Sequence, residues 1–250
     1  MYVLQYCSLG ETEDSIHTWN DKGIALGKLE RHEEAIACFE EAIRLDPENP
    51  KAWWNIGITF VQQGKYEEVV ACFDKIIKFD PKISSSWNNK GTALLRLERY
   101  EEALSCFEEA IRLDPEYSVA WNNKGSSLAS LGRHEEALSC FEEAIRLDPE
   151  YSVAWYNKAI ALGELERHEE AIACYEEAIK WDPEYSDAWY NKGSSLASLE
   201  RYEEAIACYE EVIRLDPENS DAWYNKGIAL DELERYEEAI ACYDEAIRLD

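Results

Sequence analysis

Apolar residues recur along this chain at intervals of three and four residues, which is the spacing that one face of an α-helix requires. The segment 135–147 shows the pattern clearly, because charged residues fill the positions between its apolar ones. Its apolar residues are Ala137, Leu138, Phe141, Ala144 and Ile145. Glutamates stand in the first turn of this segment and Arg146 in the last, which suits both ends of a helix dipole. The pattern predicts an amphipathic helix over residues 135–147.

A second helix is predicted directly before it, over residues 118–131. Trp121, Leu128 and Leu131 fall at helical spacing there, and Gly125 leaves room for a neighbouring helix to approach. The residues between the two segments form a turn. Pro149 cannot continue the second helix, since it lacks a backbone N–H. Residues 118–149 are therefore predicted to form two helices joined by a turn.

The same pair recurs along the chain, with a tryptophan every 34 residues. These tryptophans are Trp19, Trp53, Trp87, Trp121, Trp155, Trp189 and Trp223. A fixed period of this length is typical of a helical solenoid, in which each unit contacts its neighbours. The seven repeats span residues 16–49, 50–83, 84–117, 118–151, 152–185, 186–219 and 220–250. Residues 1–15 do not fit the repeat, and we interpret them as a leader or partial cap that is either a short helix or an ordered coil.

The repeat resembles the tetratricopeptide repeat family closely. The matching residues of the fourth copy are Trp121, Gly125, Leu128, Ala137, Phe141, Ala144 and Pro149. The resemblance covers residues 16–250, and the departures are few: Ala159 replaces the glycine, and Val69 and Ile76 replace two alanines. It implies an all-α fold, a right-handed α-solenoid or superhelix of stacked antiparallel helix pairs. The first helix of each pair would then line a concave inner groove.

Lysines stand where that family often has leucine, three residues after the tryptophan. They are Lys22, Lys90, Lys124, Lys158, Lys192 and Lys226. Their stems can cover apolar surface while the ammonium groups reach water. We also expect ion pairs four residues apart on the second helices, such as Glu108 with Arg112.

The composition is strongly acidic, with 53 acidic against 25 basic residues and a net charge of −28. This charge repels nucleic acid and anionic lipid and favours basic partners. There is no apolar run of 18 residues, so no membrane span is predicted. Residues 1–7 make a poor secretory signal, since they lack a basic start and a long apolar stretch. We expect a cytoplasmic protein.

Seven of the 8 cysteines follow the repeat: Cys38, Cys72, Cys106, Cys140, Cys174, Cys208 and Cys242. Equivalent positions of stacked helix pairs lie farther apart than the roughly 7 Å that a disulfide spans between Cα atoms. We interpret these cysteines as small buried residues of a reducing compartment.

No pattern in the sequence indicates catalysis. His32, His134 and His168 share one repeat position, which holds tyrosine in the other four copies. A metal ligand or general base would lose its role in that exchange, whereas an aromatic packing position would keep it. The repeated Glu-Glu pairs are best explained as exposed helix surface. No phosphate loop, serine-hydrolase motif or zinc motif occurs. We therefore predict a protein that is not an enzyme and needs no cofactor or metal.

The inner groove is the candidate site. Residues one, five and nine positions after each tryptophan share a helix face with the residue two positions before it. Basic side chains gather in repeats one to three, acidic side chains and tyrosines in repeats five to seven, and asparagines run through the middle. The candidate residues are Lys28, Lys51, Trp54, Asn55, Asn89, Arg96, Asn123, Tyr156, Asn157, Glu164, Asp187, Tyr190, Asn191, Asp221, Tyr224, Asn225 and Glu232. An amide both donates and accepts, so the asparagines could hold an extended peptide.

Two functions follow from this surface. The first is a scaffold that binds a protein or peptide segment, with the acidic part of the segment over Lys28, Lys51 and Arg96 and its basic part over the acidic repeats. The second is a structural module that associates head to tail through its seventh repeat, because no closing helix follows that repeat and the two groove ends carry opposite charge. The missing cap also indicates a part of a longer protein. The sequence does not identify the partner.

Overall fold

The computed structural model describes residues 2–249, with side chains from residue 14 onward, and every element in that range is an α-helix. The chain divides between Ser127 and Leu128, inside α7, into two compact units. The helices up to this division are α1 (Tyr2–Gly27), α2 (His32–Leu45), α3 (Pro50–Gln62), α4 (Tyr66–Phe79), α5 (Ser84–Arg96), α6 (Tyr100–Leu113) and α7 (Ser118–Ser130). The later ones are α8 (His134–Leu147), α9 (Ser152–Glu164), α10 (His168–Trp181), α11 (Ser186–Ser198), α12 (Tyr202–Leu215), α13 (Ser220–Glu232) and α14 (Tyr236–Leu249).

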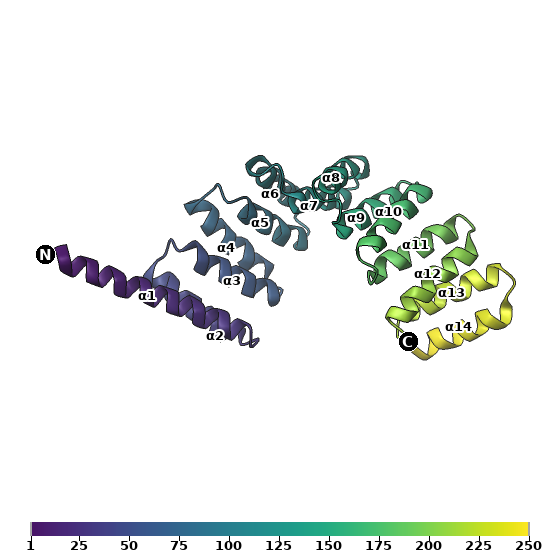
Figure 1. Ribbon diagram of the computed structural model, residues 1–250, viewed down its shortest axis with the longest axis horizontal. Helices are drawn as coiled ribbons and strands as arrows, with labels where there is room; N and C mark the ends of the chain where they lie inside the picture. Colours follow the sequence, from purple (N-terminus) through teal and green to yellow (C-terminus); the bar gives the residue numbers. More distant parts are fainter. Residues whose placement is uncertain (1, 250) are drawn as a thin grey trace. The chain divides into compact units, whose positions relative to one another are not determined.

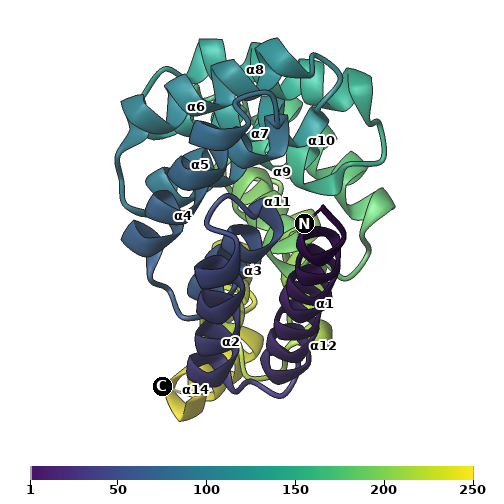
Figure 2. The ribbon, with the colours of Figure 1, turned by 90° about the vertical axis from the view of Figure 1, so that its left-hand side faces the viewer.

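The helices stack as antiparallel pairs in each unit (Figure 1). In the first unit α1 packs against α2 and α3, as Figure 2 shows, and α4 packs between α3 and α5. In the second unit α10 packs against α9 and α11, and α12 packs against α11 and α13. Odd-numbered helices are the first of each pair and even-numbered ones the second. The predicted all-α fold of stacked helix pairs is confirmed.

Each even-numbered helix buries the predicted stripe. In α8, Ala137, Leu138, Phe141 and Ala144 are buried, and the helix begins with two glutamates in its first turn. The stripe packs closely on the odd-numbered partner. A Cβ added to Gly91 in α5 would lie 2.7 Å from the ring of the fully buried Phe107 in α6, so only glycine leaves the ring enough room there. The gap that the sequence predicted at this glycine position is confirmed.

Residues 2–15 form the first half of α1, so in the structure they are helix and not coil. The seven periodic cysteines are buried thiols, as predicted. No helix among the described residues combines the length and apolar character that a bilayer crossing requires. The three histidines lie half-buried at the first position of α2, α8 and α10.

The turn within each pair has a left-handed residue that the sequence hardly reveals. It recurs every 34 residues, as glycine in two repeats and glutamate in five: Glu30, Gly64, Glu98, Gly132, Glu166, Glu200 and Glu234, with φ between 58° and 73°. The chain then closes the turn by a backbone bond such as Arg99 N–H to the carbonyl of Leu94, 2.9 Å long. The left-handed residue therefore sets the direction in which the second helix leaves the first.

The tryptophans hydrogen-bond to the loops between successive helix pairs. Six of them donate their indole N–H to the carbonyl oxygen of the proline six residues earlier, at 2.9 to 3.2 Å. In six repeats the lysine three residues after the tryptophan places its ammonium group 5.0 to 6.0 Å from the centre of the indole, and five of these indoles are among the six that donate to a proline carbonyl. The lysine stem therefore covers apolar surface as predicted. The half-buried indole connects the loop before each pair to the first helix of that pair.

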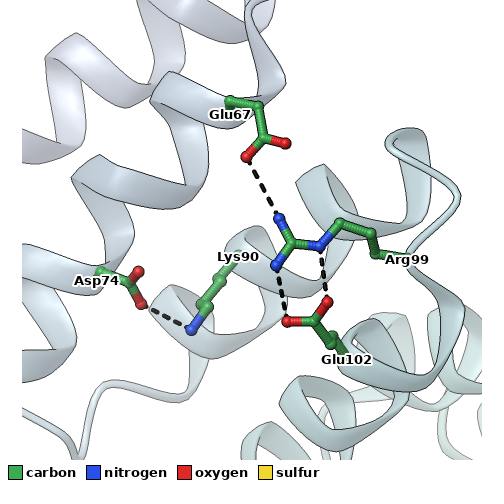
Figure 3. Close-up of polar contacts among 5 residues, drawn as sticks. All are labelled: Glu67, Asp74, Lys90, Arg99 and Glu102. Carbon is green, nitrogen blue, oxygen red and sulfur yellow. Dashed lines mark hydrogen bonds and ion pairs between the residues drawn. The ribbon is translucent and has the colours of Figure 1, made fainter.

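Ion pairs join neighbouring repeats on the even-numbered side (Figure 3). Lys90 lies 2.7 Å from Asp74, and Arg99 bridges Glu67 of the preceding repeat and Glu102 of its own. Equivalents of the lysine pair recur in four later repeats. Most of these side chains are exposed, so each pair stabilises the stack by at most about 1 kcal/mol.

The expected pair between Glu108 and Arg112 is wrong. Arg112 bonds Glu109, three residues before it, and Glu108 pairs instead with Lys124 of the next repeat at 3.2 Å. The carboxylate of Glu108 is paired with Lys124 of the neighbouring helix. The guanidinium group of Arg112 makes two hydrogen bonds to Glu109, which is nearer in the sequence.

Candidate functional site

The predicted binding residues lie on the odd-numbered helices, one turn after another. We call their shared side the A-helix face: the residues of these helices that stand one, two, five and nine positions after each repeat's tryptophan and two positions before it. In the first unit the face is carried by α1, α3, α5 and the start of α7, and in the second by α9, α11 and α13. The even-numbered helices pack behind it and fix its spacing.

The A-helix face of the first unit is basic and carries one large aromatic residue. Lys28, Lys51 and Arg96 are exposed, and none of them forms an ion pair with another described residue. Trp54 is half-buried and meets Phe73 of α4 edge-on, with ring centres 5.2 Å apart. The indole is thus held in place from behind, while three cations stay available to a ligand.

Amides of the first unit bond from one repeat to the next. Asn123 Nδ2 donates to Asn88 Oδ1 at 3.0 Å, and Asn55 Nδ2 donates to Asn20 Oδ1 at 3.4 Å. Asn89 is half-buried. The asparagines therefore have a structural role in addition to the predicted contact with a ligand, because they connect successive odd-numbered helices.

A row of tyrosines marks the A-helix face of the second unit. Tyr156, Tyr190 and Tyr224 each pack against a tyrosine of the following helix, namely Tyr175, Tyr209 and Tyr243, with ring centres 5.8 to 6.0 Å apart. Tyr156 also stacks on Tyr185 at 4.7 Å. Tyr156 and Tyr190 are half-buried, and Tyr224 is 52% exposed. These rings offer apolar area with a polar tip, which is typical of protein-binding surfaces.

Asparagines of this unit donate hydrogen bonds to the tyrosine hydroxyls. Asn225 Nδ2 donates to the hydroxyl of Tyr190 at 2.7 Å and to the carbonyl oxygen of Asp221 at 2.9 Å. Asn191 makes the same two bonds to Tyr156 and Asp187, at 3.1 and 3.0 Å. Both N–H groups of each amide are therefore in use, and only the Oδ1 atom is left to a ligand. Asn157, one repeat earlier, is half-buried.

Carboxylates flank the tyrosine row. Glu164, Asp187, Asp221 and Glu232 are all exposed. Partial burial raises the pKa of Tyr156, and the neighbouring carboxylate of Asp187 raises it further; burial and Asp221 do the same to the pKa of Tyr190. The negative charge therefore lies close to the phenol groups, and the face combines aromatic rings with carboxylates that form no ion pair with another described residue.

Two cavities open on this face at equivalent places, one in each unit. The first-unit cavity measures about 370 Å³ and is lined by Ile24, Gly27, Lys28, Phe39, Trp54, Asn55, Ile58, Thr59 and Gln62. The second-unit cavity measures about 240 Å³ and is lined by Ile160, Gly163, Glu164, His168, Tyr175, Asn191, Ser194, Ser195 and Ser198. Each lies where two odd-numbered helices meet the even-numbered helix between them. Each contains predicted residues, Lys28 and Asn55 in one and Glu164 and Asn191 in the other.

Sequence reasoning missed the residues that open and line these cavities, above all Gly27, Gly163 and Tyr175. The signal was present, since glycine occurs at that position in the first and fifth repeats alone. It was hidden because the more prominent glycine of each repeat stands four residues earlier and serves helix packing.

Models of the family described as tetratricopeptide repeat match residues 50–83, 88–152, 156–209 and 192–250, and one described as TPR repeat matches residues 23–64. No curated protein sequence matched. Among solved structures, a tetratricopeptide repeat protein from Parabacteroides merdae is similar with a TM-score of 0.72 and 17% identity, over 94% of this chain and 93% of that chain.

PilF of Pseudomonas aeruginosa is similar with a TM-score of 0.70 and 20% identity, over 83% of this chain and 94% of that chain. YrrB, described as a TPR protein with an unusual peptide-binding site, is similar with a TM-score of 0.58 and 24% identity, over 75% of this chain and 97% of that chain. At such identities these likenesses concern the fold.

Proposed function

Because the chain belongs to the tetratricopeptide repeat family, we propose that it is a non-catalytic protein-interaction scaffold that binds a peptide or helical segment of a partner on its A-helix faces. The observation that carries this proposal is the tyrosine row of the second unit, held from behind by packed rings and bordered by unpaired carboxylates. The peptide-binding site for which YrrB is described offers a parallel in a protein of similar fold.

Charge decides which segment each face favours. The second unit exposes Glu164, Asp187, Asp221 and Glu232 beside aromatic rings, a combination that attracts lysine and arginine through both Coulomb and cation–π interactions. The first unit exposes Lys28, Lys51 and Arg96, which attract carboxylates. We propose a basic partner segment for the second unit and an acidic one for the first.

A binding experiment with the full chain tests this function. Tyr156, Tyr190 and Tyr224 are changed together to alanine, and partners are recovered from the source cell by the wild type and by the variant. Each ring is partly exposed, so the variant should stay folded, which a circular dichroism melt checks. A matched control changes the exposed Ala173, Ala207 and Ala241 of the even-numbered helices to serine. We expect the tyrosine variant alone to lose its partners. Equal recovery by all three proteins would contradict the proposal.

Charge is tested separately with labelled peptides of matched length. Wild-type chain should bind a lysine-rich peptide and lose that affinity as salt rises, because exposed charges are screened over about 10 Å at 0.1 M salt. Charge reversal of Asp187 and Asp221 to lysine should abolish the preference. A lysine-rich and a neutral peptide that bind equally well would refute a role for these carboxylates.

A second candidate function is association between copies of the chain through the seventh repeat. It is favoured by a cavity of about 530 Å³ lined by Ser220, Asp221, Tyr224, Tyr243, Ala246 and Ile247. Tyr224 of this cavity corresponds to Tyr190 of the preceding repeat. The hydroxyl of Tyr190 accepts a hydrogen bond from Asn225 of the next odd-numbered helix. Sedimentation velocity over a range of concentrations decides, since a monomer at every concentration would exclude this association.

A further inference from the structure

The two cavities share one feature, a lining glycine at the same position of the first and fifth repeats. Gly27 ends α1 and Gly163 is the second-last residue of α9. The other repeats fill this position with side chains: Val61, Leu95, Ala129, Ala197 and Asp231. Each of these two cavities therefore coincides with the absence of a side chain at this position.

Packing does not require glycine at either place. A Cβ added to Gly27 or Gly163 would meet nothing within 4 Å, whereas one added to Gly91 would meet the ring of Phe107 at 2.7 Å. Neither glycine has a positive φ. Since glycine lowers helix stability relative to alanine, the fold gains nothing from Gly163 that would offset this loss. What the glycine does provide is the opening itself.

The cavity of the second unit is lined by hydrogen-bond acceptors. Ser194 Oγ donates its hydrogen to the carbonyl oxygen of Tyr190, and Ser198 Oγ donates to that of Ser194, so both oxygens keep lone pairs for a ligand. Both N–H groups of Asn191 are in use, which leaves its Oδ1 as an acceptor. Glu164 adds a carboxylate, and no lysine or arginine lines the cavity. Such a lining fits a group that only donates.

One atom of this lining, Nδ1 of His168, is buried and has no hydrogen-bond partner among the described residues. Tyr175 is 3% exposed, and its hydroxyl makes no hydrogen bond to another described residue. The equivalent Tyr209, one repeat later, has the oxygen of Ser194 at 3.4 Å. Buried polar groups are normally hydrogen-bonded, so a ligand in the cavity would satisfy Nδ1 of His168, and it would also reach the Tyr175 hydroxyl in the cavity wall.

The matching cavity of the first unit shows that the opening and its chemistry are separate features. Lys28 stands there in place of Glu164, Phe39 in place of Tyr175, and Ile58 in place of Ser194. It has the same glycine and an adjacent cation, with fewer acceptors. The three acceptors of the sixth repeat recur in the fourth as Asn123, Ser126 and Ser130, but only the fifth repeat combines the opening glycine with a glutamate and a tyrosine, at Gly163, Glu164 and Tyr175.

We propose that the cavity between α9, α10 and α11 is a side-chain pocket that takes a lysine or arginine of the partner segment. Glu164 neutralises its charge, and the oxygens of Ser194, Ser198 and Asn191, with the Tyr175 hydroxyl, accept its N–H groups. Gly163 admits the side chain. This inference rests on the proposed function and adds to it one defined contact and the residue type that makes it.

The test uses the full chain and peptides selected on it from an unbiased display library of short random sequences. We expect the selected peptides to share one lysine or arginine, and its replacement by norleucine or citrulline to weaken binding at least about tenfold, which is the loss of one charge-assisted contact. Gly163→Leu copies Leu95 of the third repeat and closes the pocket. It should weaken binding of the selected peptide to the same extent with no fall in melting temperature. Glu164→Gln should remove the preference for the charged peptide over the citrulline peptide.

Gly27→Leu is the matched control, since it closes the first-unit cavity and should leave the affinity for this peptide within about twofold. Selected peptides that bind the wild type without a shared cation, or that bind the Gly163→Leu variant as tightly as the wild type, would overturn the pocket and leave the scaffold function standing. If no peptide binds wild-type chain, the pocket and the proposed function fail together. A lower melting temperature for Gly163→Leu would contradict the open space from which the pocket is inferred.

Discussion

Replacing Glu98 by glycine should stabilise the protein, although it removes a side chain. Glu98 follows α5 with a φ of 59° and is exposed. In the left-handed region an L-residue other than glycine is disfavoured by roughly 1–2 kcal/mol, because its Cβ crowds the backbone. Glycine avoids this cost. Its greater conformational freedom in the unfolded chain lowers the free energy of unfolding by about 0.5–1 kcal/mol, which offsets part of the gain. We therefore expect a net gain of about 0.5–1 kcal/mol for Glu98→Gly.

The gain should accumulate, because five turns carry glutamate at this position and they lie in separate repeats. The five glutamates changed together to glycine should add about 2.5–5 kcal/mol by the same reasoning. Urea unfolding followed by circular dichroism measures the change, with the midpoint as the readout, since the slope should stay the same.

The reverse substitution is the internal control. Gly132 holds the same place in the fourth repeat with a φ of 73°, and a Cβ there would meet open space. Gly132→Glu should therefore lower stability through backbone strain alone. If Glu98→Gly destabilised the chain and Gly132→Glu left its stability unchanged, these residues would not have a left-handed conformation. The turn described here, and the direction it gives to each second helix, would then be refuted.

Three further outcomes are expected. Phe107→Ala should cost about 3–5 kcal/mol of unfolding free energy, because the ring is fully buried under α5, and a cost below about 1 kcal/mol would contradict that packing. The hydrogen bond from Arg99 lowers the pKa of Glu102, so the pair stabilises the fold above the ordinary glutamate value of about 4.3 and this contribution disappears as the pH falls through the lowered pKa. The difference in melting temperature between wild type and Arg99→Met should thus shrink in acid, and a constant difference would rule out the ion pair. Burial raises the pKa of Cys72 to about 12 and of Cys208 to about 11, so both should react with a thiol reagent at neutral pH only after unfolding; rapid native labelling, located by peptide mass spectrometry, would show that they are accessible.

Much of the fold can be predicted from residues that recur at the same position of each repeat. Trp121, Gly125 and Phe141 recur at fixed intervals, so the number of helix pairs and their buried faces could be predicted with no other information. The five left-handed glutamates could not, because glutamate is an ordinary helix residue and nothing in its side chain indicates a positive φ. Only the glycines at 64 and 132 point to that turn.

The candidate face was harder to predict in detail than in outline. Its helix spacing and the change of charge between the units are visible in the sequence, since both depend on residue type and register. Which atoms remain for a ligand depends on contacts between repeats. Asn191 reads as a donor and an acceptor in sequence, yet Tyr156 and Asp187 occupy both of its N–H groups. The role of Gly163 likewise appears only once its neighbours are known to leave space.

One measurement tests the account most directly: backbone NMR shift mapping of the full chain with a lysine-containing peptide. If the A-helix face binds the partner, the shifts should change along α9, α11 and α13, with the largest changes at Gly163, Glu164 and Ser194. Changes confined to the exposed sides of α10, α12 and α14 would contradict the account, because the tyrosine row and the pocket would then be no part of the binding surface.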